Sequence, residues 1–180
     1  MIIFFYLILA TFGFLIPIGI AIFGIFAILG DLKGAPYVPT NKKLLQEILE
    51  DANLKKGQRF LELGSGDGRV TLLAVREFGV VGEGIEIHPL LVLYSNILAK
   101  WQKLDARFKT GDFYKLNLGK TDVIFVFLLP NTLKKLAPKF LKECKKGTLI
   151  ITHGFKIAGL EKNLIKTQKR KLFSTYFYHI

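Results

Sequence analysis

The stretch Glu62-Leu63-Gly64-Ser65-Gly66-Asp67-Gly68-Arg69 separates two patterns of different kinds. Residues 59–63 form a short, largely apolar run typical of a strand, and residues 70–75 place Val and Leu at helical spacing. The sequence therefore predicts a strand, a glycine turn and a helix, the place where an open α/β sheet binds a nucleotide-like ligand. Three alternating glycines let the backbone turn sharply and approach a ligand, and the helix N-terminus offers unpaired N–H groups.

The spacing of the glycines distinguishes between two kinds of nucleotide-binding loop. A dinucleotide fingerprint G-x-G-x-x-G starting at Gly64 would need glycine at position 69, which is Arg69, so the pattern is instead E-x-G-x-G-x-G. A second acidic residue, Glu86, ends a strand predicted over 80–86. A carboxylate about 20 positions beyond the loop, at the tip of the next strand, can hold a ribose diol.

Strand and helix patterns alternate through the rest of the chain. We predict a first helix capped by Thr40, then strand 59–63, helix 69–78, strand 80–86, helix 89–103, strands 106–109 and 122–128, helix 131–143 and strand 147–152. This alternation predicts an α/β fold with a doubly wound, mainly parallel sheet. Two further strands, 163–167 and 172–178, are predicted at the C-terminus.

The first thirty residues contain no charged side chain. As a helix they would be roughly 43 Å long, enough to span a hydrocarbon core of about 30 Å. A cleaved signal peptide is the alternative, but a basic start is missing and the apolar run is too long. We therefore expect one uncleaved transmembrane anchor over 1–30 and a connector over 31–40. Lys33, Lys42 and Lys43 follow the span, which favours a domain (41–180) on the cytoplasmic side, or the equivalent inner side of an organelle membrane.

The whole net charge of +12 falls on residues 31–180. Basic residues are widely spread, with a cluster at 169–171, which indicates a solvated face attracted to anionic lipid. Nucleic-acid binding is the disfavoured alternative, because no aromatic-interleaved RNA motif accompanies the charge. Cys144 is the chain's single cysteine, so neither a disulfide framework nor a cysteine zinc site is expected, and no metal site is predicted.

The E-x-G-x-G-x-G loop resembles motif I of the class I S-adenosylmethionine-dependent methyltransferases, which have a Rossmann-like sheet ending in an antiparallel strand pair. The resemblance implies S-adenosylmethionine as cofactor. It places Glu62 near the methionine part, Asp112 at the adenine amino group and Phe113 against the adenine ring. The cofactor residues implied by the loop are Gly64, Ser65, Gly66, Asp67 and Gly68, although Asp67 could equally cap the helix.

Four segments together carry a closer resemblance: A-P-Y-V-P-T at 35–40, E-L-G-S-G-D-G-R at 62–69, G-x-E-I-H-P at 84–89 and D-V-I-F-V-F-L-L-P at 122–130. They are similar to the membrane-anchored protein-lysine methyltransferases of mitochondria, which modify the ATP synthase c subunit or the adenine nucleotide translocase, and their prokaryotic relatives. This resemblance implies that Tyr37 and Thr40 lie at the cofactor pocket. Three features depart from the family: Glu62 replaces Asp, His88 stands where relatives usually have Asn, and 152–156 lacks the expected proline. His88 is interpreted as a local hydrogen-bonding residue before a helix rather than a catalytic one.

The segment after the fourth predicted main strand bears on the methyl acceptor. Leu128, Leu129, Pro130 and Asn131 occupy the place where methyltransferases acting on bases or glutamine often carry Asn/Asp-Pro-Pro-aromatic. This apolar lip disfavours nucleobase methylation and suits the aliphatic stem of a lysine, so we predict a protein substrate, which could itself be a membrane protein. A non-catalytic tethered cofactor-binding module, and a small-molecule or lipid methyltransferase at the membrane surface, remain as alternatives.

Catalytic residues are not assigned by the sequence. A lysine acceptor has a reference pKa of about 10.4, which desolvation beside a sulfonium lowers, so no dedicated base is required. His153 lies at a strand tip but is interpreted as a structural histidine. Trp101 and Phe113 are predicted to be core residues rather than substrate-stacking ones.

Overall fold

The computed structural model describes residues 4, 6, 11, 13–19, 41–170 and 172–180. The chain divides into two units, Met1–Val38 and Pro39–Ile180. The described residues of the first unit are helical. Within the described part of the chain, no helix combines the length and apolar character needed to cross a membrane. The anchor predicted over 1–30 lies mostly outside the described residues and the connector over 31–40 entirely so; both stay predictions.

The second unit is built on one seven-stranded sheet with the order β3-β2-β1-β4-β5-β7-β6. Its strands are β1 (Arg59–Leu63), β2 (Val81–Glu86), β3 (Ala106–Thr110), β4 (Val123–Val126), β5 (Leu149–Gly154), β6 (Leu164–Gln168) and β7 (Ser174–His179). The first five strands pair in parallel, and β7 pairs antiparallel with both β5 and β6. The predicted doubly wound, mainly parallel sheet with a C-terminal antiparallel pair is confirmed.

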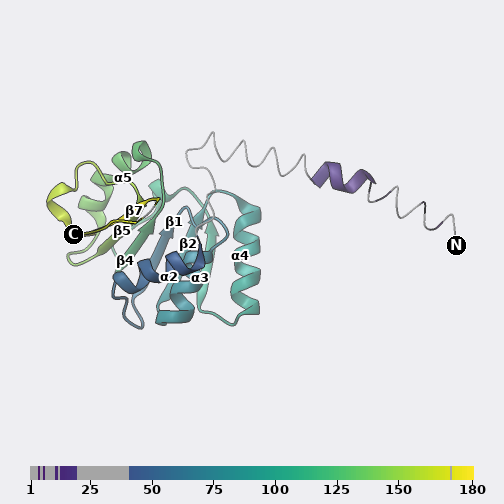
Figure 1. Cartoon of the computed structure of the whole chain (residues 1–180), viewed down its shortest axis with the longest axis horizontal. Coiled ribbons are helices and arrows are strands. Elements are labelled where there is room, and N and C mark those ends of the chain that lie inside the picture. Colours follow the sequence, from purple (N-terminus) through teal and green to yellow (C-terminus); the bar gives the residue numbers. More distant parts are fainter. Residues whose placement is uncertain (1–3, 5, 7–10, 12, 20–40, 171) are drawn as a thin grey trace. The chain divides into compact units, whose positions relative to one another are not determined.

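Four α-helices accompany the sheet: α2 (Lys42–Asp51), α3 (Arg69–Phe78), α4 (Pro89–Trp101) and α5 (Pro130–Glu143), with short 3-10 turns η1 (Phe113–Lys115) and η2 (Glu161–Asn163). α2 and α3 lie in front of the sheet in Figure 1, α4 lies at the β3 end, and α5 lies towards the β5 and β7 end. Apolar residues of α2, α3 and α4 form one core with Phe60, Phe125 and Ile151 of the sheet. All four residues of β4 are buried, as expected for a central parallel strand.

Close packing of α3 on the sheet depends on a glycine of β2. A Cβ at Gly82 would lie 2.5 Å from Cγ2 of Val75 and 2.7 Å from Cγ2 of Thr71. Only a residue without a side chain lets the helix approach this near. The close approach holds α3 against β2.

Several predicted boundaries differ from the structure by a few residues, and three of these differences have a local explanation. The cap of α2 is Asn41, whose Oδ1 accepts from Lys43 N at 2.8 Å, rather than Thr40, which lies outside the described residues. Strand β4 ends at Val126, before the predicted 128, because the chain leaves the sheet there to form the apolar lip. Strand β5 begins at Leu149 because a turn precedes it, in which Thr148 N donates to the Lys145 carbonyl.

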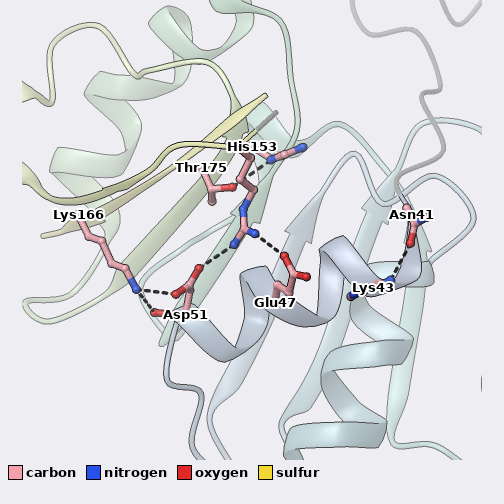
Figure 2. Close-up of polar contacts among 8 residues, drawn as sticks. Asn41, Lys43, Glu47, Asp51, His153, Lys166 and Thr175 are labelled. Atoms are coloured by element: carbon pink, nitrogen blue, oxygen red, sulfur yellow. Dashed lines mark hydrogen bonds and ion pairs between the residues drawn. The ribbon is translucent and has the colours of Figure 1, made fainter. Parts of the chain in front are cut away.

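Ion pairs connect α2 to the C-terminal strand pair (Figure 2). Arg170 donates from Nη1 to Glu47 and from Nη2 to Asp51, both at 2.7 Å, and Lys166 Nζ lies 2.9 Å from Asp51 Oδ1. The Arg170 side chain is only 11% exposed. The interpretation of 169–171 as a lipid-facing cluster is therefore wrong for Arg170, because its guanidinium is turned inward onto α2.

We expect Arg170→Gln to lower the free energy of unfolding by about 2 kcal/mol, because two charge-assisted hydrogen bonds of a largely buried group are lost. Urea denaturation of the full chain, followed by circular dichroism, measures the change. Lys109→Gln is the matched control, since Lys109 is 62% exposed and its ion pair with Glu83 lies at the surface. Equal losses in the two variants would show that Arg170 does not hold α2 in place.

Candidate active site

The predicted glycine turn forms a tight loop between β1 and α3. Gly64, Gly66 and Gly68 have φ values of +75°, +53° and +76°, a region that other residues rarely adopt. The N–H groups of Gly64 and Ser65 donate to the Ile85 carbonyl at 2.8 and 3.0 Å. The loop is thereby held against the end of β2, and Gly68 serves as the N-cap of α3.

Glu86, at the end of β2, is brought next to the loop as predicted. Its Oε2 accepts from Gly66 N at 2.9 Å, and its Oε1 accepts from Ile87 N at 2.8 Å and His88 N at 3.1 Å. A carboxylate has about four acceptor directions, so these three backbone donors fix its position and leave one direction for a ligand hydroxyl. For Glu86 to bind both hydroxyls of a diol, one of these three backbone N–H groups must give up its hydrogen bond to the carboxylate.

Glu62 is turned towards α3. The side chain is 4% exposed, and its Oε2 accepts from Thr71 N at 3.1 Å and from Thr71 Oγ1 at 2.6 Å. Burial raises the pKa of Glu62 to about 8, although the two hydrogen bonds from Thr71 oppose the shift. Glu62 therefore links the end of β1 to the first turn of α3, a positioning role that the sequence did not predict.

Asp67 and Ser65 are the two other loop residues with polar side chains. Asp67 Oδ1 accepts from Arg69 N at 3.3 Å, and the Arg69 guanidinium binds both carboxylate oxygens of Asp67 at 2.6–2.9 Å. Asp67 therefore makes local contacts just before α3, whose N-cap is Gly68, and its implied role at the cofactor stays a prediction. Ser65 is 3% exposed, and its Oγ has no hydrogen-bond partner within the described part of the chain.

The segment after β3 lies at the same edge of the sheet, because β3 is parallel to β2. Asp112 is exposed and its Oδ1 accepts from Tyr114 N at 2.9 Å. The half-buried Phe113 ring lies 4.8 Å from the ring of Tyr114. Tyr114 also bonds the side chain of Thr132 in α5, and burial raises the pKa of its hydroxyl. Tyr114 was missed because sequence spacing does not reveal that η1 meets the start of α5.

The predicted lip after β4 lies against the glycine loop. A Cβ at Gly64 would be 3.1 Å from Cδ2 of the buried Leu128. Leu129, Pro130 and Asn131 are exposed, and α5 begins at Pro130. An apolar edge therefore borders the loop.

An aromatic cluster, defined by Phe127, His153, Phe155 and Phe173, adjoins this lip. The Phe127 ring lies 4.9 Å from the ring of His153 and 5.6 Å from that of Phe173, and Phe155 lies 6.4 Å from Phe173. Phe127, Phe155 and Phe173 are half-buried. The cluster was not predicted, because it forms only when β7 pairs antiparallel with β5 and brings Phe173 to this edge.

His153 is a buried member of the cluster. It is 1% exposed, and its Nδ1 lies 3.1 Å from Thr175 Oγ1 (Figure 2). Burial, with a smaller contribution from the Arg170 charge, lowers the pKa of His153 to about 4. A group with so low a pKa is a poor proton acceptor for a lysine, which favours the predicted structural interpretation.

The low pKa of His153 predicts a loss of stability in acid. In the unfolded chain the histidine has a pKa of about 6.5, whereas in the folded chain it stays neutral down to about pH 4. Between pH 6.5 and pH 4 the unfolded state therefore binds more protons, and the free energy of unfolding falls as the pH drops. We expect a loss of about 2 kcal/mol from pH 7 to pH 5. Because Glu62 has a raised pKa, it contributes the opposite slope between pH 4.5 and 8.

Urea denaturation at several pH values, compared between the full chain and His153→Phe, isolates the histidine contribution from that of Glu62. The parent should lose stability relative to the variant as pH falls. Parallel pH profiles would contradict a neutral, buried His153.

Four further residues were given a role from the sequence: Tyr37, Thr40, Trp101 and Phe113. Tyr37 and Thr40 lie outside the described residues, so their role at the pocket stays a prediction. Trp101 is not a core residue: it is 79% exposed, because it lies at the last turn of α4 on the side away from the sheet. Phe113 is half-buried and lies at the site edge rather than in the core.

The glycine loop, Glu86 and Phe113 together form a site suited to a nucleoside cofactor. The left-handed glycines keep side chains away from the middle of the loop, Glu86 offers a fixed carboxylate to a ribose hydroxyl, and the half-buried Phe113 lies at the same edge. These features fit S-adenosylmethionine. Together with the strand order, they define a class I S-adenosylmethionine-dependent methyltransferase.

Comparison with known proteins leads to the same class. The family model described as the ANTKMT methyltransferase domain matches residues 62–163. A protein-lysine N-methyltransferase of Saccharolobus islandicus is 32% identical over 149 residues, covering 81% of this chain and 92% of that protein. The chain belongs to the ANTKMT methyltransferase domain family, and S-adenosylmethionine is its cofactor.

Other relatives match shorter parts or only the fold. The human lysine N-methyltransferase named for the c subunit of ATP synthase is 27% identical over 123 residues, covering 67% of this chain and 52% of the human protein. Among solved structures, an RNA methyltransferase from Salinibacter ruber in complex with S-adenosyl-L-homocysteine has a TM-score of 0.75 and 30% identity, covering 79% of this chain and 94% of that chain. A SAM-dependent methyltransferase from Thiobacillus denitrificans, also with S-adenosyl-L-homocysteine, has a TM-score of 0.59 at 22% identity. The match covers 72% of this chain and 54% of that chain, and it supports the fold alone.

Proposed function

We propose that this enzyme is a membrane-anchored protein-lysine N-methyltransferase. The observation that carries the proposal is the apolar lip, Leu128 to Asn131, which borders the glycine loop and adjoins the aromatic cluster. The relatives named as lysine N-methyltransferases support the same acceptor chemistry. A lysine stem is aliphatic, so it finds a suited surface at this apolar edge.

The chain's residues would hold the cofactor from three sides. The loop from Gly64 to Gly68 approaches the methionine part with backbone alone, Glu86 accepts from the ribose, and Asp112 with Phe113 receives the adenine. The bound cofactor supplies an electrophilic methyl group on a sulfonium. Transfer from it to a lysine nitrogen would be an in-line displacement, so alignment of the acceptor would be the main task of the protein.

The acceptor lysine must arrive uncharged. The rings of Phe127 and Phe173 are half-buried, and Leu129 follows Phe127 by two residues. A lysine ammonium placed against this apolar edge would lose hydration, which lowers its pKa. The proton then leaves to water before transfer, and His153 takes no part in its removal. Shape and desolvation by the lip therefore replace a dedicated base.

The anchor and its orientation belong to the proposal. Residues 1–30 are free of charge, and Lys33, Lys42 and Lys43 follow them, which supports one span with residues 41–180 on the cytoplasmic side or the equivalent inner side of an organelle membrane. A membrane protein is then the best-placed acceptor, because an enzyme held at the bilayer meets it by diffusion in two dimensions.

Transfer of a labelled methyl group tests the proposal. The full chain in vesicles is supplied with S-adenosylmethionine carrying a tritiated methyl group, together with membrane proteins stripped of existing methylation. We expect label in protein, and mass spectrometry should place it on the side-chain nitrogen of a lysine.

Two other acceptors serve as controls in the same reaction. RNA is included because a solved relative is named as an RNA methyltransferase, and extracted lipid is included because the proposed anchor places the enzyme at the bilayer. Label confined to RNA or to lipid would contradict lysine methylation while leaving the methyltransferase class intact. Leu129→Asp, which places a charge on the lip, should reduce transfer to lysine but preserve cofactor binding.

A further inference from the structure

Helix α4 carries a row of large apolar side chains that face away from the protein. Nothing in the charge-free stretch from Pro89 to Ala99 interrupts this row. We define the α4 row by five side chains that are exposed by half or more: Leu90, 52%; Leu93, 57%; Tyr94, 50%; Ile97, 57%; and Trp101, 79%. At 3.6 residues per turn they fall within roughly 100° of the helix circumference and extend for roughly 16 Å.

The row does not result from a loosely seated helix. The opposite side of α4 buries Val92, Ser95 and Ala99 against the sheet. Asn96 fixes the rotation of the helix, because its Nδ2 donates to the Phe108 carbonyl at 2.8 Å and its Oδ1 accepts from Phe108 N at 3.0 Å. These bonds satisfy the outer backbone groups of the edge strand β3. The apolar row is thus presented outward by a firmly docked helix.

We propose that the α4 row lies on the surface of an anionic lipid bilayer, with its side chains in the boundary between headgroups and acyl chains. A helix that binds in this plane has an apolar face with Trp, Tyr and Leu, and basic residues beside it. The exposed Lys100 and Lys103 flank Trp101, where their ammonium groups can reach lipid phosphates. The net charge of +12 draws the same surface to anionic lipid.

Charge also disfavours a second copy of the chain as the occupant. Pairing two α4 rows face to face would bring together two proteins that each carry a net charge of +12. A bilayer with anionic headgroups complements both the apolar row and its basic end. The contact is separate from the proposed anchor over 1–30 and does not depend on the identity of the methyl acceptor.

The position of α4 gives the contact a consequence for the enzyme. The helix begins directly after Glu86 and His88, at the edge of the sheet where the cofactor loop lies. Contact of the row with the bilayer would fix the orientation of the domain and hold this edge next to the headgroups. The lip would then meet lysines of membrane proteins that lie just outside the hydrocarbon.

Trp101 provides a direct test, because it is the single tryptophan of the chain and reports on α4 alone. The full chain is reconstituted into phosphatidylcholine vesicles with and without phosphatidylglycerol. With the anionic lipid we expect Trp101 emission to shift to shorter wavelength, to be quenched by lipids brominated near the top of their acyl chains, and to be protected from acrylamide in the aqueous phase.

A double variant and a matched control distinguish an effect of the α4 row from an effect of any exposed apolar residue. Leu93→Glu with Ile97→Glu should restore acrylamide quenching and abolish bromolipid quenching, while Ile165→Glu, an equally exposed apolar residue on β6, should behave as the parent. Circular dichroism and cofactor binding verify that each variant is folded.

Three outcomes would overturn the proposal. Trp101 of the parent could remain open to acrylamide although the chain floats with the vesicles, which would leave the anchor intact and remove the α4 contact. Protection could persist unchanged in the folded double variant. It could also arise without lipid and grow with protein concentration, which would identify a second copy as the occupant. If the chain does not float with the vesicles, the anchor is contradicted. Quenching of Trp101 fluorescence would then be measured after vesicles are added to the protein in solution.

Discussion

Gly66→Arg is expected to weaken the binding of S-adenosylmethionine by at least about 1000-fold, or roughly 4 kcal/mol. Gly66 has a φ of +53°, in the left-handed region, and its N–H is bonded to Glu86. A side chain here adds about 1–2 kcal/mol of backbone strain and fills the space through which the loop would approach the cofactor. Calorimetric titration of the full chain in detergent with S-adenosylmethionine measures the loss, and methyl transfer should disappear with it.

Gly57→Arg is the matched control for this variant. Gly57 also has a positive φ, +81°, but it lies in the exposed turn before β1 with open space around its Cβ position. It should show the backbone strain as a small loss of stability and bind the cofactor as the parent does. If the two variants bound the cofactor equally well, the glycine loop could not be the cofactor site.

Glu86→Ala is expected to lower the affinity for S-adenosylmethionine by about 100-fold, because charge-assisted hydrogen bonds to a ribose contribute about 1.5–3 kcal/mol each. The variant also frees Gly66 N from its partner, so the loop loses one of its fixed points. The same calorimetric titration gives the affinity, and S-adenosyl-L-homocysteine should be weakened to a similar extent, since the ribose is common to both.

Glu83→Ala provides the comparison within the same strand. Glu83 lies three residues earlier on β2, and its ion pair with Lys109 is at the surface, so its removal should change affinity by less than about twofold. If the two substitutions weakened cofactor binding equally, the loss of affinity would come from disturbing β2 as a whole and not from a lost ribose contact.

The parts of the fold that could be predicted are those encoded by local patterns. The ends of β1 and α3 match the prediction to the residue, because an apolar run, a glycine turn and a helical spacing follow one another without interruption. The proximity of Glu86 to the loop could also be predicted, since parallel neighbouring strands end at the same edge of a sheet.

The parts that could not be predicted depend on contacts between distant segments. Glu62 has the expected position, but its side chain is committed to Thr71 because burial favours a hydrogen-bonded carboxyl over one facing the loop opening. The aromatic cluster requires the antiparallel pairing of β7. Trp101 was predicted to be buried because it is large and apolar, but composition cannot tell whether the last turn of a helix still lies over the sheet.

The most direct test of the account is the structure of the full chain bound to S-adenosyl-L-homocysteine. We predict the ribose hydroxyls on the Glu86 carboxylate, the adenine beside Phe113 with its amino group towards Asp112, and the sulfur facing the lip at Leu129. A ligand bound away from the loop, or one whose ribose makes no contact with Glu86, would contradict the assignment of this site.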